Sequence, residues 1–400
     1  MPSSVNTMDF MQASTLLNAL RKQATGQTAL AATSEAEFVS VATTLLQMGV
    51  DPIMSAISQL VGKTIFSIRP YSAKFQGVEV DAQTWGYITR KLSIADKDFV
   101  DDAGFDLSDG YSKDMYIVNV PNVLQVNYYG QNIFQKYYTI YRDQLNSAFT
   151  GSAQFGEFMT MVTQNALDMV EQTREVVRRM TIANFIGGKL AMESQLASEY
   201  ENGVIHALTD YNSDTGSSLT STTVFAKENF DDFCKWLRAK IATVSKMMSE
   251  RTILFQGNIA NKVVTRHTPV ADQKMYLYSP FVDQMNARVL ADTFNDQRAE
   301  YADFESVNFW QSAKTPDSIN IKPAYLKVSD GTIIEASDAV SKSGIIGVIF
   351  DRDALGVTIM NEETSTTPYN SRGRYWNTWM SFIQRYWNDF TEKGCVILLD

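Results

Sequence analysis

The feature that most constrains the fold is one long stretch without proline, residues 153–186. Its only glycine, Gly156, lies in the first turn, and Gly187-Gly188 is predicted to end the helix. At 1.5 Å per residue such a helix is about 50 Å long, longer than an ordinary domain needs, so the rest of the chain is expected to be arranged along it. Apolar side chains recur in the stretch at helical spacing: Phe155, Phe158, Met159, Val162, Ala166, Met169, Val170, Val177, Met180 and Ala183.

Composition narrows the function classes. The chain has 400 residues, 44% of them hydrophobic and 20% charged, with a formal charge of −10. These values are typical of a globular protein of two or three domains, and the excess of acid does not suit a nucleic-acid reader. Two cysteines and two histidines are too few for a disulfide framework, and they disfavour a zinc site or a histidine-dependent triad. We expect no secretion signal, no membrane span and a reducing, cytoplasm-like compartment.

A search for catalytic and ligand-binding motifs gives little. The chain has no dinucleotide-binding glycine pattern, phosphate loop, nucleophile elbow or H-E-x-x-H. Six aspartates within residues 95–110 miss the spacing of a calcium loop and are read as a solvated tip. Arg174, Arg178 and Arg179 have Glu171 and Glu175 at ion-pairing distance along the helix, which favours a solvated charged face. Cys234 and Cys395 are expected to be buried, His206 and His267 to be structural or exposed, and no metal or cofactor is predicted.

The first 63 residues are predicted to form short amphipathic helices. Ser34 and Glu37 have the spacing of a capping box, and Asp51-Pro52 is a second helix start. Helices this short are not stable alone in water. We expect this arm to dock on something else.

Residues 64–130 change to a period of two, which indicates strands near both ends of the segment. The alternating residues are Phe66 and Ile68, Val78 and Val80, and Tyr116, Val118 and Val120. Between them lies the acidic stretch 95–110, with few apolar residues. A long two-stranded excursion of this kind cannot form its own core and should lie against another molecule or domain.

After a low-complexity stretch at 209–223, predicted to be a loop, strands and helices mix as in an α+β domain. An amphipathic helix is predicted over 230–248, and strands at 252–255 and 276–278. Residues 344–350 are an apolar run bounded by glycine and Asp351, which is typical of a central buried strand. The aromatic segment 375–390 fits both helical and strand periods, and 395–399 is a further buried strand.

This order of elements resembles the major capsid proteins of tailed double-stranded DNA phages, which have the α+β Hong Kong 97-type fold. The segments VPNVLQVNYYGQNIFQKYYTI (120–140) and PYNSRGRYWNTWMSFIQRYWNDF (368–390) are similar to those of small podovirus capsid proteins. The resemblance implies an N-terminal arm (1–63), an extended β loop (64–130) and an axial domain (223–357). It also implies a peripheral domain (131–222 and 358–400) with a spine helix at 153–186, and it makes the aromatic segment a strand.

The same resemblance implies that the chain is not an enzyme but a virion component, assembled in the host bacterial cytoplasm. Pentamers and hexamers would tile an icosahedral shell around the DNA genome, with only non-specific proximity to DNA and no contact with membrane. The 63-residue arm is too short for a scaffolding segment, so a separate scaffolding protein is expected, with a portal and a decoration protein as further partners. Two alternatives remain at this point, an encapsulin-like nanocompartment shell and, less favoured, a metabolic enzyme.

The subunit interface is expected on the extended loop, whose aromatic side chains no single subunit could cover. The residues concerned are Phe75, Trp85, Tyr87, Phe99, Phe105 and Tyr111. Covalent cross-linking between subunits, known in the type member, has two lysines available in the loop, Lys74 and Lys91, and nothing in the sequence marks either.

Overall fold

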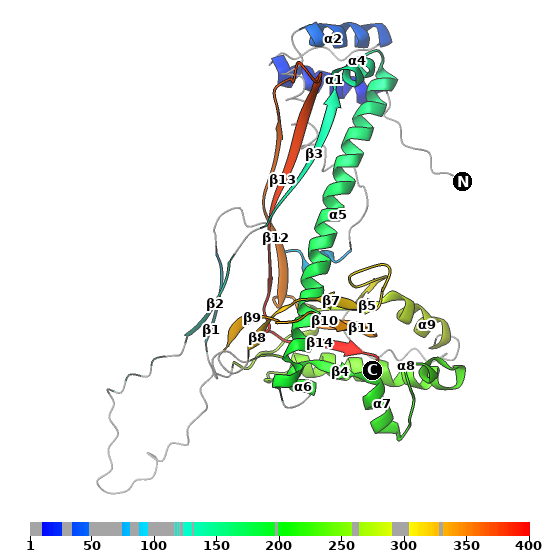
Figure 1. Ribbon diagram of the computed structural model, residues 1–400, viewed down its shortest axis with the longest axis vertical. Helices are drawn as coiled ribbons and strands as arrows, with labels where there is room; N and C mark the ends of the chain where they lie inside the picture. The colour runs from blue at the N-terminus through cyan, green and yellow to red at the C-terminus, as the bar shows by residue number, and fades with distance from the viewer. Residues whose placement is uncertain are drawn as a thin grey trace.

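One helix forms the long axis of the molecule in the computed structural model (Figure 1). Helix α5 spans Ser152–Met192, 41 residues and so about 60 Å, and it connects a helical layer at one end with a compact sheet at the other. The structure describes residues 10–25, 34–47, 74–80, 88–94, 116, 118, 120, 123–129, 132–196, 199–257, 264–289, 304–327 and 331–400.

The predicted spine helix is confirmed, but its predicted end is wrong. The helix runs through Gly187 and Gly188 and continues to Met192. A Cβ atom on Gly188 would lie 2.3 Å from Cζ of Phe390, and one on Gly187 would lie 2.8 Å from Cγ2 of Ile321. The two glycines therefore serve close packing against distant parts of the chain and do not end the helix.

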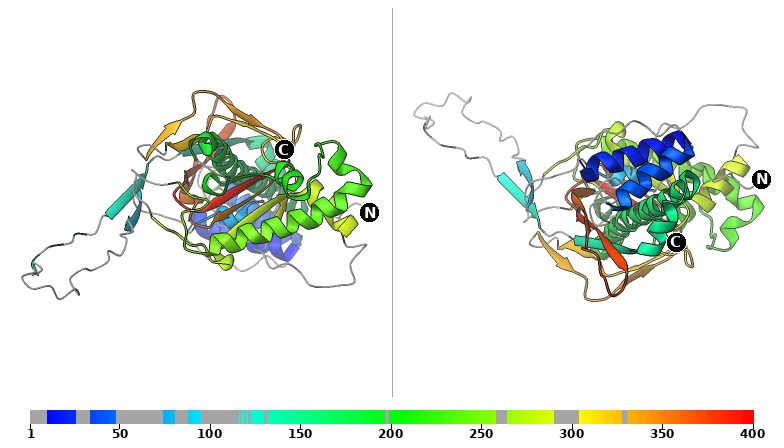
Figure 2. Two further views of the ribbon diagram at one scale, coloured as in Figure 1. Left: turned by 90° about the horizontal axis from the view of Figure 1, so that it is seen from below. Right: turned by 90° about the horizontal axis from the view of Figure 1, so that it is seen from above.

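Two N-terminal helices lie across the start of α5 (Figures 1 and 2). They are α1 (Phe10–Thr25) and α2 (Glu35–Gln47), joined there by α4 (Arg142–Ala148). The predicted cap is present, with the backbone N–H of Glu37 3.4 Å from Oγ of Ser34. Phe38 packs edge-on against Phe155 at 5.8 Å between ring centroids. The described part of the arm thus docks on its own subunit, and the helix start at Asp51-Pro52 lies outside the described residues.

A three-stranded antiparallel sheet runs alongside α5, in the order β12-β13-β3. Its strands are β3 (Asn132–Tyr141), β12 (Leu355–Thr366) and β13 (Tyr375–Asn388). Along β13 every second side chain from Trp376 to Phe382 is buried. The aromatic segment is therefore a strand, as the resemblance implied.

The compact end of the subunit is built on a five-stranded sheet in the order β4-β14-β11-β5-β6. Its strands are β4 (Val204–His206), β5 (Gln273–Tyr278), β6 (Phe304–Val307), β11 (Ile345–Asp351) and β14 (Gly394–Leu398). The predicted central strand is confirmed, since β11 is buried along its whole length with neighbours on both sides, and β14 is equally buried.

Helices cover both faces of this sheet. Apolar side chains of α7 (Ala207–Thr215), α8 (Lys227–Ser249) and α9 (Ser279–Val289) form one core with it. The second half of α5 forms another core with the opposite face. Within the described residues no helix is long and apolar enough to cross a membrane.

Shorter elements complete the described chain. They are η1 (Gln76–Val78), η3 (Glu193–Gln195), α6 (Glu199–Asn202), η4 (Thr223–Phe225), η5 (Val270–Asp272) and the two-stranded pairs β7 (Ile319–Ile321) with β10 (Val340–Lys342) and β8 (Ala324–Lys327) with β9 (Thr332–Glu335).

Two local predictions are wrong. Residues 252–255 do not form a strand: only Thr252 pairs, with Arg266, and Phe255 has a φ of 66°. The stretch 209–223 is not all loop, because α7 continues to Thr215 before the left-handed Gly216.

Within the segment predicted as the extended loop, two strands form a hairpin that projects to one side of the long axis (Figures 1 and 2). Strands β1 (Thr89–Ile94) and β2 (Val123–Tyr128) pair antiparallel from Thr89 opposite Tyr128 to Ile94 opposite Val123. The two-stranded prediction is confirmed, but not its residues. Val78 lies in η1, and Tyr116, Val118 and Val120 are outside strands, while residues 66, 68 and 95–110 lie outside the described residues.

The predicted domain boundaries cut the five-stranded sheet. Strands β4 and β14 were placed with the peripheral domain, yet they pair with each other, and β14 pairs with β11. The sheet therefore draws β4 and β14 into the same packed unit as β5, β6 and β11.

Candidate subunit interface and the root of the extended loop

The hairpin β1–β2, which we call the loop root, has a reversed arrangement of side chains in β1, whereas β2 turns its apolar Leu124 and Tyr128 inward in the ordinary way. Thr89, Lys91 and Ser93 of β1 face the subunit, while Leu92 and Ile94 face outward with 65% and 63% of their surface exposed. An antiparallel sheet with one solvated face normally places apolar residues inward and polar residues outward. The outward face of the loop root is therefore a surface that the single subunit leaves without cover.

Exposed apolar side chains continue from this face along the chain. We call the set the outer strip: Ile88, Leu92, Ile94, Tyr116, Val118, Val120 and Val123. Tyr116 and Val118 each have 82% of their surface exposed. Large apolar side chains left exposed in this number on one segment make it a candidate contact surface.

A second apolar surface lies on the flank of α5. A hollow of about 490 Å³, which we call the spine groove, is lined by Val176, Met180 and Ala183 of the helix and by Phe309 and Ile321 opposite. Asp168, Gln172, Glu175, Arg179 and Gln311 complete its lining. Val176 and Met180 are half exposed. The groove is shaped to receive apolar side chains within a polar rim.

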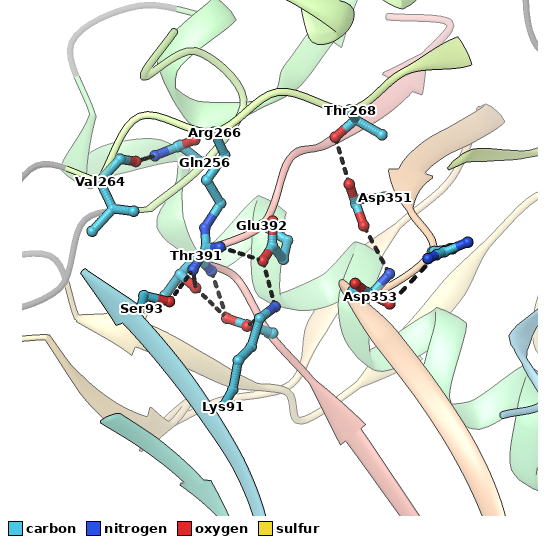
Figure 3. A network of polar contacts seen from close by, with 12 residues as sticks. Lys91, Ser93, Gln256, Val264, Arg266, Thr268, Asp351, Asp353, Thr391 and Glu392 are labelled. Carbon is cyan, nitrogen blue, oxygen red and sulfur yellow. Dashed lines mark hydrogen bonds and ion pairs between the residues drawn. The ribbon is translucent and has the colours of Figure 1, made fainter. Parts of the chain in front are cut away.

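Polar contacts attach the loop root to the subunit (Figure 3). Nζ of Lys91 lies 2.7 Å from Oδ2 of Asp389 and also contacts the carboxylate of Glu392. Arg266 pairs with Glu392 at 2.7 Å and donates to Oγ of Ser93 at 2.9 Å. Thr391 donates its backbone N–H and its hydroxyl to Asp389 at 2.9 and 2.6 Å. We call these six residues the root cluster.

The ionisable groups of the root cluster are unequal. Burial works against the charge of Asp389, but Lys91 and the hydrogen bonds from Thr391 outweigh it and hold the pKa of this carboxyl below its usual range. For Glu392 burial prevails over Lys91 and Arg266, and its pKa is raised. Burial also opposes the charge of Lys91, yet Asp389 and Glu392 together raise its pKa. On acidification Glu392 is therefore the first group of the cluster to take up a proton.

The structure corrects the prediction for Phe75. This side chain is fully buried inside its own subunit, 5.0 Å from the ring of Tyr276 and 4.9 Å from the guanidinium carbon of Arg179. Its backbone is held in the left-handed region, with a φ of 64°, and its N–H donates to Glu305 at 3.1 Å. Trp85, Tyr87, Phe99, Phe105 and Tyr111 lie outside the described residues.

The arginines of the spine helix are also corrected. Arg178 and Arg179 are buried and do not form a solvated face. Arg178 pairs with Glu79, and Arg179 pairs with Glu175 and donates to the carbonyl of Phe309. The two side chains join residues 74–80 and 309 to the middle of α5.

Sequence reasoning missed the root cluster. Lys91 appeared only as one of two lysines in the loop, and Arg266, Asp389 and Glu392 were not singled out. A partial signal was present, because apolar and polar residues alternate from Lys91 to Ile94 with the period of a strand, although Arg90 interrupts the pattern before them. Which face turns inward depends on partners that are distant in the sequence, Lys91 and Asp389 being 298 residues apart.

The long central helix, the sheet along it, the compact unit at its end and the lateral hairpin together define a tailed-phage capsid subunit of the Hong Kong 97 type. Among solved structures, the capsid of Staphylococcus phage Andhra matches with a TM-score of 0.54 at 11% identity, over 83% of this chain and 86% of that one. A chain in the structure of the head fiber and inner core protein gp22 of native bacteriophage P68 matches with a TM-score of 0.51 at 10% identity, over 83% and 86% of the two chains.

The family model of the Phi29-like phage major capsid protein matches residues 17–397. The chain therefore belongs to this family and forms the shell of the virion. A search among curated protein sequences gives no match. Membership of a phage capsid family decides against the nanocompartment alternative, and it identifies the chain as a structural protein.

Proposed function

We propose that the subunits assemble as pentamers and hexamers into an icosahedral shell around the phage double-stranded DNA, with each extended loop lying over a neighbouring subunit. The observation that carries this proposal is the reversed strand β1 of the loop root. Its Lys91 and Ser93 have polar partners in their own subunit, while its Leu92 and Ile94 point away from that subunit. We assign the cover of that face to a second copy of the chain, because symmetry would then repeat the same contact at every subunit of the shell.

The spine groove supplies a receiving surface for this contact. It combines apolar side chains with a polar rim, as the contact surface for an extended apolar segment requires. Burying one large aliphatic side chain contributes about 1.5–3 kcal/mol, and a large part of that gain is offset by the loss of freedom on association. Stability of the shell would therefore come from many modest contacts closed by symmetry.

The division into domains follows the sheets in this proposal. The axial domain would comprise the five-stranded sheet with α7, α8 and α9, and so would include residues 199–222 and 394–400. The peripheral domain would comprise α5, the three-stranded sheet and the helices of the arm. A separate scaffolding protein, a portal and a decoration protein are the further partners we propose, with assembly in the bacterial cytoplasm.

The role of the chain in this proposal is structural and not catalytic. Its net charge of −10 suits a container that lies beside DNA without gripping it. The negatively charged DNA would then be repelled by the shell while it is packaged.

The test is replacement of residues 95–115 by a short Gly/Ser linker. This change spares the loop root and the buried Phe75. The variant should keep the unfolding transition of the wild type and form no closed shells by electron microscopy. Closed shells of normal diameter would refute the role that we assign to the loop.

A further inference from the structure

The root cluster joins the loop to an unusual place in the subunit. Residues 389–393 are the connection by which the chain passes from β13, in the three-stranded sheet, to β14, in the five-stranded sheet. This connection is itself fixed, because the N–H of Asp389 donates to Ala354 at 2.6 Å and the N–H of Asp351 donates to Lys393 at 2.9 Å. A loop attached here is placed relative to both sheets at once.

We propose that the root cluster is a latch that fixes the direction of the extended loop relative to the two sheets, and so aims the loop at its neighbour. The proposal rests on the function proposed above, since a loop without a neighbour has nothing to be aimed at.

The contacts of the latch come from two sides. Lys91 reaches Asp389 and Glu392 from β1, while Arg266 reaches Glu392 from the segment before β5 and also holds Ser93. Glu392 thus lies between the two cations (Figure 3). Charge-assisted hydrogen bonds are directional, whereas apolar contacts tolerate sliding and rotation. Two such attachments on one strand fix its angle as well as its position.

A further contact lies beyond the cluster on the same face of β1. Nη1 of the buried Arg385 donates to Oγ1 of Thr89 at 2.9 Å. On β2, the ring of Tyr128 lies 6.3 Å from that of Trp387, and Leu124 is buried. Loss of the cluster would therefore leave the hairpin attached through β2 and Thr89, while Lys91 and Ser93 of β1 lose their side-chain contacts with the rest of the subunit. The expected defect is in the direction of the loop and not in the fold of the subunit.

The latch contains two cations and two carboxylates, so its charges balance. A pair of variants can therefore separate the effect of losing the charge balance from the effect of losing the bridge. Lys91→Met removes the cation that bridges Asp389 and Glu392 and leaves a surplus carboxylate buried, which destabilises the subunit. Lys91→Met with Glu392→Gln restores the balance but not the bridge. Lys240→Met is the matched control. Lys240 of α8 forms an ion pair with Asp210 of α7 at 2.8 Å, and both side chains are largely shielded from solvent and lie away from the loop.

The experiment measures hydrogen exchange on the full-length chain as free subunits, and particle formation by electron microscopy. In both latch variants the amides of β1 should exchange about tenfold faster or more; exchange of β11 and β14 should be unchanged in the double variant and faster in Lys91→Met, which lowers the stability of the whole subunit. The double variant should recover the unfolding temperature without recovering protection of β1, and both should give irregular or open particles. Lys240→Met should leave the exchange of β1 unchanged.

Unchanged exchange of β1 in the double variant would overturn the latch. Faster exchange together with normal closed shells would overturn its role in aiming the loop. Because the exchange is measured on free subunits, its outcome is independent of the linker variant that tests the proposed function.

Discussion

Strands β11 and β1 have seven and six residues, yet they place their apolar side chains in opposite ways. Every residue of β11 is buried inside the subunit, with Val348 and Ile349 in the cores on opposite sides of the sheet. In β1 Thr89, Lys91 and Ser93 face the subunit, while Arg90, Leu92 and Ile94 face outward. The apolar side chains of β11 are buried within a single chain, whereas those of β1 are expected to be buried only after assembly. The comparison separates what folds a subunit from what joins subunits.

The largest effect should come from placing charge on the outer strip. Leu92→Asp with Ile94→Asp should abolish closed shells, because two carboxylates would have to be desolvated in the contact. The free subunit should unfold at nearly the wild-type temperature, since both positions are exposed in it. Electron microscopy and thermal unfolding measure the two results.

A matched control for that variant is Ile333→Asp on β9, an aliphatic side chain with half of its surface exposed. It should leave shells intact. Equal loss of shells in both variants would mean that assembly is sensitive to exposed apolar residues in general. It would contradict the proposal that β1 carries a subunit contact.

The same substitution in the two strands should give different losses of stability. Ile349→Ala should lower the free energy of unfolding by about 2–5 kcal/mol, because it opens a cavity in a close-packed core. Ile94→Ala should change it by no more than about 0.5 kcal/mol. Denaturant unfolding of free subunits compares the two directly, and similar losses would show that the loop root is part of the folding core.

A smaller effect is expected where α5 meets the connection between the sheets. Gly188→Ala should cost about 1–3 kcal/mol of unfolding free energy, since its methyl group would overlap the ring of Phe390. Adding Phe390→Leu should recover part of the loss, because two residues in contact are not additive. A strictly additive double variant would show that the cost comes from elsewhere.

The smallest effect should be that of His206, which lies between Glu193 at 2.6 Å and Asp400 at 3.2 Å. Burial opposes protonation of the imidazole, but the two carboxylates outweigh it and raise the pKa above the usual value of 6.5. The histidine therefore stabilises fully below pH 6.5, and this contribution is lost as the pH rises through the raised pKa. The unfolding temperatures of wild type and His206→Gln should differ most at acidic pH and converge at alkaline pH. A constant difference would contradict this.

The sequence predicted the elements whose pattern is local. Strand β11 follows from an unbroken apolar run between glycine and aspartate, and α8 follows from apolar residues at helical spacing. What failed depends on distant partners. In the sequence, a glycine pair that ends a helix cannot be distinguished from one that makes room for the ring of Phe390. Likewise, Arg178 has the spacing of a solvated helix face, although Glu79, far away in the sequence, pairs with it.

The site was less predictable than the fold for the same reason. The resemblance indicated the extended loop as the interface, and the alternation in residues 91–94 was available to support it. The direction of that alternation could not be predicted, because the root cluster is assembled from β1, Arg266 and residues 389–392. Phe75 was assigned outward on its aromatic character alone, and its cover by Arg179 and Tyr276 comes from other parts of the chain.

Strand β14 has a consequence for how the protein is made. It lies between β4 and β11, and all five of its residues are buried. While the ribosome has not yet released residues 394–398, β4 and β11 both present an open edge and the sheet is incomplete. A nascent chain, or a fragment that terminates early, therefore lacks the complete five-stranded sheet on which the connection to the loop root rests. The five-stranded sheet can therefore close only after translation has passed residue 398.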